Sequence, residues 1–191
     1  MDFKEKLEGK RIVLLRPYPP TFDLAQKIFA EVIVSQENLR PWLPWANKEY
    51  KQEDAFVYLT DWCEKSWNEK KGFAYIICDK QTGKFMGCID AMDINDKHKS
   101  CEIGYWISIN YQGNGYMHEA LELLEAECFR AGINRIVISN DTRNIRSANV
   151  AKRAGYHLDG ILRQNRWDGY ANMFVDSNVW SKIKDIIDNK V

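Results

Sequence analysis

The spacing of apolar residues along the chain predicts an order of helices and strands. Helical spacing of apolar residues indicates helices, and short apolar runs between turn residues indicate strands. The expected helices are residues 24–33, 53–68, 117–128 and 145–154, with a further helix from Ser181 onward. The expected strands are residues 12–16, 73–79, 85–92, 100–109, 135–139, 156–162 and 172–180. This order predicts a mixed sheet with helices on its faces, in an α/β or α+β arrangement.

The segment 39–45 interrupts this regular pattern. Its prolines, Pro41 and Pro44, exclude a regular helix, and Trp42 and Trp45 are too apolar to remain fully in water. Two interpretations are open. The tryptophans anchor the core, or they form the wall of a cleft in front of the following helix.

Composition narrows the class of protein. The chain has 191 residues, which suits one compact domain with a sizeable core. Its formal net charge is +0 and its Lys and Arg residues are spread out, which argues against nucleic acid or an acidic membrane as the main partner. No apolar run is long enough to span a bilayer, and the charged first residues are unlike a secretory signal. We therefore expect a cytoplasmic protein.

The cysteines and histidines do not form a metal-binding pattern. The 5 cysteines include no C-x-x-C pair, and His98, His118 and His157 lack the spacing of metal ligands. Reduced cysteines and no bound metal are the expectation.

A glycine-rich turn between a strand and a helix carries the clearest chemical signal. Residues 112–117 read Gln-Gly-Asn-Gly-Tyr-Met. A helix begins with unpaired backbone N–H groups and a partial positive charge, and Gly113 and Gly115 allow the backbone to approach an anion. The alternative is that the glycines only turn the chain. His118 stands where a dinucleotide motif has its third glycine, and no Gly-Lys-Ser/Thr follows, so a nicotinamide cofactor and a nucleoside triphosphate are not indicated.

Three segments together resemble the GNAT acetyltransferases. Residues 111–117 resemble their pyrophosphate-binding loop, and residues 144–156 resemble their second cofactor motif. Residues 39–45 are similar to a segment of the ribosomal-protein N-terminal acetyltransferase branch. The segments occur in the family's order, and the resemblance covers residues 12–180. It implies the GNAT fold, a mixed and mostly antiparallel central sheet of about seven strands flanked by helices, with residues 1–191 as a single domain.

The resemblance also implies acetyl-CoA as the co-substrate, with no metal. In this family the backbone N–H groups of the loop hold the pyrophosphate, and the strand end at residues 106–108 pairs with the pantetheine amides like an added strand. Met117 departs from the small residue that usually ends the loop. The implied cofactor-binding residues are Trp106, Ile107, Ser108, Gln112, Gly113, Asn114, Gly115, Tyr116, Met117, Asn144 and Ser147.

The candidate catalytic residues are Ser147, which the resemblance implies, and Glu102, which the alternation of its strand indicates. Many GNAT enzymes place a tyrosine where this chain has Ala151, whereas the ribosomal-protein branch uses a serine, matched by Ser147, against the departing thiolate. Strand alternation puts Glu102 on one face with Gly104 and Trp106, where its carboxylate has room to take the amine proton directly or through a water. The alternative for Glu102 is a solvated strand carboxylate.

Four further residues keep more than one interpretation. Asn144 is a natural N-cap for the helix 145–154, and the resemblance adds a hydrogen bond to the pantetheine arm. Arg166 stands where this branch often has another carboxylate, so Glu102 works alone, Asp168 substitutes, or catalysis is slow. Trp42 and Trp45 are core anchors or substrate-binding residues that wall the acceptor cleft.

The acceptor implied by the resemblance is a primary amine, above all a protein N-terminus such as that of a ribosomal protein. The alternatives are a small amine (a polyamine, an amino acid or an antibiotic) and an acyl-CoA-binding sensor without catalysis. Seven tryptophans permit a homodimer but do not require one.

Overall fold

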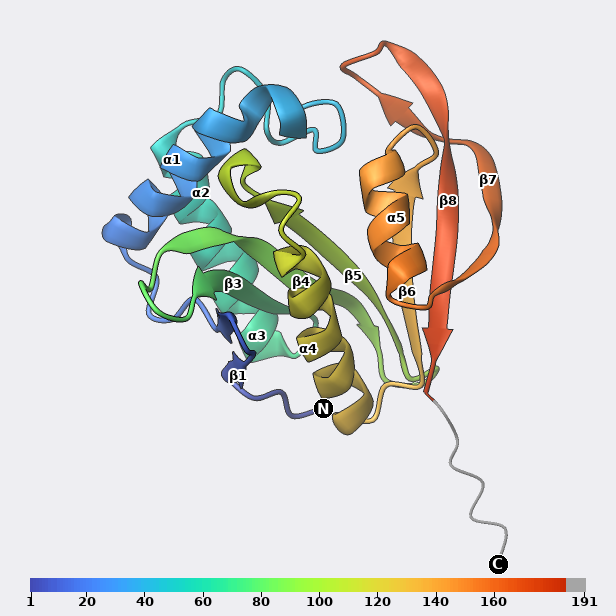
Figure 1. Cartoon of the computed structure of the whole chain (residues 1–191), viewed down its shortest axis with the longest axis horizontal. Helices are drawn as coiled ribbons and strands as arrows, with labels where there is room; N and C mark the ends of the chain where they lie inside the picture. The colour runs from blue at the N-terminus through green and yellow to red at the C-terminus, as the bar shows by residue number, and fades with distance from the viewer. Residues whose placement is uncertain (185–191) are drawn as a thin grey trace, which may run out of the picture.

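The computed structural model describes residues 1–184 (Figure 1). Its strands are β1 (Lys6–Glu8), β2 (Ile12–Leu15), β3 (Phe73–Asp79), β4 (Phe85–Asn95), β5 (Ser100–Ile107), β6 (Arg135–Asp141), β7 (His157–Asp168) and β8 (Met173–Ile183). Its helical segments are α1 (Phe22–Leu39), α2 (Gln52–Val57), η1 (Tyr58–Glu64), α3 (Lys65–Glu69), η2 (Ile109–Tyr111), α4 (Tyr116–Arg130) and α5 (Ile145–Arg153).

The strands form one sheet in the order β1-β2-β3-β4-β5-β6-β8-β7. Every neighbouring pair is antiparallel except β5 and β6, which are parallel. The prediction of a mixed and mostly antiparallel sheet is confirmed, with eight strands instead of about seven. The additional strand is β1. It is three residues long and exposes Lys6 and Glu8, so no apolar run marks it in the sequence.

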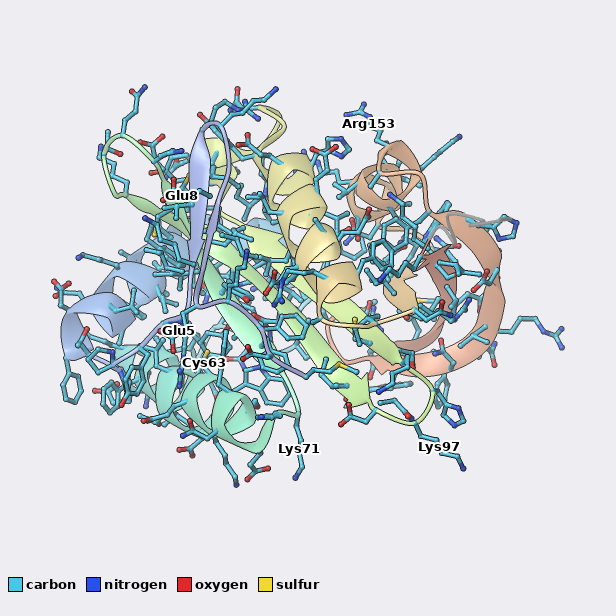
Figure 2. All side chains as sticks on the ribbon, turned by 90° about the horizontal axis from the view of Figure 1, so that it is seen from below. Glu5, Glu8, Cys63, Lys71, Lys97 and Arg153 are labelled. Atoms are coloured by element: carbon cyan, nitrogen blue, oxygen red, sulfur yellow. The ribbon has the colours of Figure 1, made fainter. Side chains whose placement is uncertain are left out.

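Helices cover both faces of the central strands. On β3, Phe73, Tyr75 and Ile77 belong to a core cluster with α4, while the alternate residues pack with α1, α2 and η1. Seen from below, α4 and the helical segment that contains Cys63 lie on opposite faces of the sheet (Figure 2). A strand buried on both faces reads as a continuous apolar run, which is why residues 73–79 were identifiable.

The expected helix 53–68 forms, but it is not a regular α-helix. Between α2 and α3 the segment η1 has π-helical geometry. The Thr60 hydroxyl donates to the carbonyl oxygens of Phe56 and Val57 at 3.2 and 3.3 Å within this helix. Insertions of this kind change which side chains share a helix face, and they often occur at functional sites. Both Tyr58 and Trp62, on η1, line a cavity described below.

The prediction of a helix from Ser181 onward is wrong for residues 181–183. These residues complete β8, where Ser181 pairs with Val137 of β6 on one side and with His157 of β7 on the other. The rest of that expected helix, from residue 185, lies outside the described residues. Within residues 1–184, no helix combines the length and the apolar character needed to cross a membrane.

Candidate active site

The parallel strands β5 and β6 separate, and a cavity opens between them. Their pairing runs from Ser100 with Arg135 only to Glu102 with Val137. Beyond this point the two strands diverge (Figure 1). The cavity has a volume of about 770 Å³, and residues 103–107 of β5 form one wall of it. The edge of β5 that faces this cavity is therefore available to a ligand with amide groups.

The glycine turn lies at one end of this cavity. Gly113 and Gly115 have φ angles of +81° and +77°. Residues with a side chain rarely adopt such angles, so the turn requires glycine at both positions. Gly115 is the N-cap of α4 and no side chain caps the helix there. The first N–H groups of α4 are thus free to bind an anion at its positive end.

All but one of the predicted turn residues line the cavity. Gln112, Gly113, Gly115, Tyr116 and Met117 do so. Asn114 does not: its carbonyl accepts a hydrogen bond of 2.8 Å from Arg11 of the β1–β2 turn.

Arg11 connects the turn to α4. Its guanidinium lies 2.8 Å from the carboxylate of Glu119 and 4.6 Å from the centre of the Tyr116 ring. These contacts hold the turn from the side away from the cavity, a role that the sequence did not indicate.

Two arginines of α5 add positive charge to the cavity. Arg146 and Arg153 line it, and Arg146 also donates to the side-chain oxygen of Gln112 at 2.8 Å. Both lie inside the sequence motif 144–156, but the resemblance does not assign them to the site. The one available signal was their i, i+7 spacing, which places them on the same side of a helix.

The N-terminus of α5 brings a serine and a tyrosine together. Asn144 caps the helix by accepting a hydrogen bond of 3.1 Å from the Ser147 backbone N–H, as its N-cap interpretation requires. The hydroxyl groups of Ser147 and Tyr105 are 3.1 Å apart, and both residues line the cavity. Burial raises the pKa of Tyr105 to about 12, so the phenol stays protonated near neutral pH.

Glu102 lies on the predicted face of β5 but lines neither of the cavities described here. Burial raises the pKa of its carboxyl group, although hydrogen bonds from Ser139 oppose the shift. Ser139 lines the first cavity. Ser139 therefore connects the Glu102 carboxylate to this cavity.

The three residues predicted at the end of β5 have different surroundings. Trp106 and Ile107 line the first cavity. Ser108 is fully buried and lines neither cavity. Its hydroxyl donates to Glu31 at 2.5 Å and accepts from Ser35 at 3.2 Å, so its side chain ties β5 to α1.

A second cavity, of about 1020 Å³, lies on the face of the sheet that α1, α2 and η1 cover. Leu43, Gly104, Tyr105 and Trp106 line both cavities, so the two adjoin at the middle of β5. The tryptophans of the proline segment are divided between them: Trp42 lines the first and Trp45 the second. The Trp45 ring meets the Trp106 ring edge-on at a centroid distance of 5.9 Å.

Asp168 and Arg166 belong to an ion cluster at the end of β6. Arg143 contacts the carboxylates of Asp141 and Asp168 at 2.7 and 2.5 Å, and Arg166 contacts Asp141 at 3.1 Å. Asp168 also accepts from the backbone N–H groups of residues 170 and 171. Burial raises the pKa of Asp168, but these hydrogen bonds outweigh it and lower the pKa overall. A carboxylate with a lowered pKa and occupied oxygens is poorly suited to accept a proton.

Comparisons with known proteins agree with this geometry. The family model of the acetyltransferase (GNAT) domain matches residues 13–157. A ribosomal-protein-serine acetyltransferase of Escherichia coli (strain K12) is 31% identical over 117 residues, which are 61% of this chain and 64% of that enzyme. The match thus spans less than two thirds of the relative. A spermidine N(1)-acetyltransferase of the same strain is 25% identical over 62% of this chain and 61% of its own length.

Solved structures share the fold over almost the whole chain. The microcin C7 self-immunity acetyltransferase MccE, in complex with acetyl-CoA and AMP, superposes with a TM-score of 0.82 at 25% identity, covering 92% of this chain and 93% of that one. The ribosomal L7/L12 α-N-protein acetyltransferase RimL, in complex with coenzyme A, superposes with a TM-score of 0.84 at 22% identity, covering 94% and 98%.

Proposed function

Since the chain belongs to the GNAT acetyltransferase family, we propose that it transfers the acetyl group of acetyl-CoA to a primary amine. One observation carries this proposal. The free edge of β5, the open N-terminus of α4 and the Ser147–Tyr105 pair all border one cavity. They suit the amides, the diphosphate and the thioester sulfur of acetyl-CoA respectively.

The residues of this cavity have distinct tasks in the proposal. The N–H groups at the start of α4 bind the diphosphate of acetyl-CoA. Arg146 and Arg153 add positive charge for the remaining phosphate group of acetyl-CoA. The edge of β5 orients the pantetheine arm. Acetyl-CoA supplies an activated acyl group with a thiolate leaving group. Ser147 donates a hydrogen bond to that thiolate at the positive end of α5, and Tyr105 keeps the Ser147 hydroxyl in place.

Glu102 enters the proposal as a proton acceptor that acts at a distance. Its raised pKa suits a base, and Ser139 connects it to the first cavity. Since Glu102 lines neither cavity, it has no direct contact with an acceptor amine there.

The two interpretations of Asn144 predict different results for two substitutions. We expect Asn144→Ala to reduce the free energy of unfolding by about 1 kcal/mol, because α5 loses its N-cap. Asn144→Ser keeps a capping oxygen and the stability, but it removes the amide N–H donor without adding a charge to the cavity. Urea unfolding and calorimetric titration with acetyl-CoA check both effects. Weaker binding by Asn144→Ser at unchanged stability assigns the amide to the pantetheine arm, and unchanged binding leaves Asn144 with the cap alone.

A protein N-terminus, such as that of a ribosomal protein, is the acceptor that we propose first, for an enzyme of the cytoplasm. The similarity to the ribosomal-protein-serine acetyltransferase supports it. The five cysteines are free and buried, which is in keeping with a reducing compartment.

A small cationic amine is the second candidate, and the second cavity favours it. Its lining includes the carboxylates of Glu49, Asp54 and Asp90 and one ammonium, that of Lys51. An excess of negative charge attracts amines with several positive charges. The similarity to the spermidine acetyltransferase agrees with this candidate.

Steady-state release of CoA from acetyl-CoA tests the proposal. The acceptors are a peptide that begins with Ser-Ala, the same peptide with a blocked N-terminus, and spermidine. We expect release with the free peptide or with spermidine, and none with the blocked peptide. Tight binding of acetyl-CoA without release on any amine would instead establish a sensor, and failure to bind acetyl-CoA would overturn the proposal.

A further inference from the structure

The second cavity contains a carboxylate, that of Asp90, to which the proposed acetyl transfer assigns no role. Asp90 lies on β4 and is half-buried at the cavity surface. Its oxygens accept from the hydroxyl of Tyr58 at 3.3 and 3.4 Å, in the π-helical segment η1. No cationic side chain pairs with Asp90 among residues 1–184. Partial burial of a carboxylate without a cationic partner favours either its protonation or the binding of a cationic ligand.

Asp90 lies beside the junction of the two cavities. On the sheet, Asp90 is the direct cross-strand neighbour of Gly104. Gly104 lines both cavities, and the flexible side chain of Met92 lies above it. Neighbours of this kind have Cβ positions about 5 Å apart, so Asp90 points into the second cavity beside the junction. Asp90 and the junction of the two cavities are therefore neighbours on the sheet.

Aromatic rings surround the approach to Asp90. Trp45, Tyr50, Trp62 and Trp106 line the second cavity. Trp45 lies 5.7 Å from the ring of Tyr50 and 5.9 Å from the ring of Trp106. Faces of tryptophan and tyrosine attract cations, and their bodies exclude water. A cavity lined by aromatic rings and a carboxylate favours a cationic ammonium group over a neutral or anionic group.

We propose that Asp90 binds the ammonium group of the acceptor amine in the second cavity and accepts its proton as the amine attacks the acetyl group. This inference rests on the proposed acetyl transfer. It names a base that contacts the substrate, which Glu102 does not.

The reaction transfers one acetyl group to the nitrogen and releases two protons from the ammonium group. Asp90 takes one proton from the ammonium group, and the freed nitrogen lone pair forms the C–N bond with the acetyl carbonyl carbon. The C–S bond breaks, and its electron pair leaves with the thiolate, to which Ser147 donates a hydrogen bond. The second proton lost by the nitrogen goes to solvent, and the products are an acetylated amine and CoA.

The surroundings of Asp90 suit a base that works near neutral pH. Burial raises the pKa of Asp90 to about 7, while hydrogen bonds from the Tyr58 hydroxyl and the Tyr75 backbone N–H oppose the shift. Both neighbouring thiols, Cys63 on η1 and Cys88 on β4, have pKa values raised by burial and stay neutral. The remaining titratable groups that line the cavity are those of Glu49, Tyr50, Lys51, Asp54 and Tyr105.

Asp90→Asn is the direct test, measured on whichever of the Ser-Ala peptide and spermidine the wild type acetylates faster. We expect kcat/KM at pH 7 to fall by about 100-fold or more, with unchanged affinity for acetyl-CoA. The loss should shrink as the pH rises toward the pKa of the amine, since the amine is then already neutral. Asp96→Asn, which changes an exposed carboxylate in the turn after the same strand that lines neither cavity, is the matched control and should retain wild-type kinetics. Glu102→Gln should cost less than Asp90→Asn.

A measurement on the wild type does not depend on any variant folding. The ascending limb of kcat/KM against pH should lie near 7 for each amine that the wild type acetylates, because it reports Asp90 and not the amine. A limb that follows the pKa of each amine would overturn the inference, as would wild-type kcat/KM in a folded Asp90→Asn variant. These results require that the wild type releases CoA. No release by the wild type is instead a failure of the proposed acetyl transfer itself.

Discussion

Replacing Arg143 with methionine is expected to reduce the free energy of unfolding by about 3 kcal/mol. Arg143 bridges the carboxylates of Asp141 and Asp168, whose side chains are only 1% and 6% exposed. Removal of the arginine leaves two buried negative charges beside each other, and Arg166 remains as a cationic contact of Asp141 alone. Breaking a buried ion pair in this way costs about 3–5 kcal/mol. We place the effect at the lower end because the Arg143 side chain is 40% exposed and water screens the site.

Urea unfolding at pH 7 measures this loss. Arg163→Met is the matched control, since Arg163 is exposed on β7 and makes no ion pair with any other described residue. We expect the control to change stability by less than about 0.5 kcal/mol. Equal stability of the two variants would show that the ion cluster does not hold the β6 and β7 ends together.

The same cluster predicts how stability depends on pH. Burial raises the pKa of Asp141, but the hydrogen bonds and charge of Arg143 and the charge of Arg166 outweigh it and lower the pKa overall. A carboxyl group with a lowered pKa in the folded state stabilises the fold fully above its unfolded pKa, which is about 3.9 for Asp. This contribution is lost as the pH falls below that value through the folded pKa. Unfolding curves from pH 7 to pH 3 should therefore converge for wild type and Arg143→Met.

Local signals account for the parts of the site that the sequence predicted. The turn 112–117 and the motif 144–156 are each continuous in sequence. Each contains the N-cap residue of a helix, Gly115 for α4 and Asn144 for α5. Gly113 and Gly115 have the positive φ angles that their residue type suggested, and Asn144 caps α5. Such features depend on a few neighbouring residues, so the sequence alone is sufficient to locate them.

Contacts between distant segments could not be predicted in the same way. The Tyr105–Ser147 hydrogen bond joins residues 42 positions apart, and the Tyr58–Asp90 bond joins residues 32 apart. Alternation along β5 gave the correct face for Glu102, but only the pairing of β5 with β6 shows that this residue lies before the strands separate. The π-helical segment η1, which helps to shape the second cavity, leaves an apolar pattern that an α-helix also explains.

The hydroxyl pair at α5 leads to the second large effect. We expect Ser147→Ala to lower kcat by about 100-fold with little change in the affinity for acetyl-CoA. A donor that stabilises developing negative charge acts mainly in the transition state, and loss of one such donor costs about 10²–10³ in kcat. Ser147→Thr keeps the hydroxyl and should retain most of the activity. Single-turnover release of CoA separates the chemical step from product release.

Tyr105→Phe tests whether the Tyr105 hydroxyl orients Ser147 or itself donates a hydrogen bond to the leaving thiolate. If Tyr105 acts by orienting the Ser147 hydroxyl, at a distance of 3.1 Å, its removal should lower kcat less than Ser147→Ala does. The double variant should then be no slower than Ser147→Ala alone, because residues that act as a unit are not additive. Additive losses would mean that the Tyr105 phenol, which its raised pKa keeps protonated, reaches the leaving thiolate independently. Retained kcat in Ser147→Ala with loss in Tyr105→Phe would transfer the role of donor from the serine to the tyrosine.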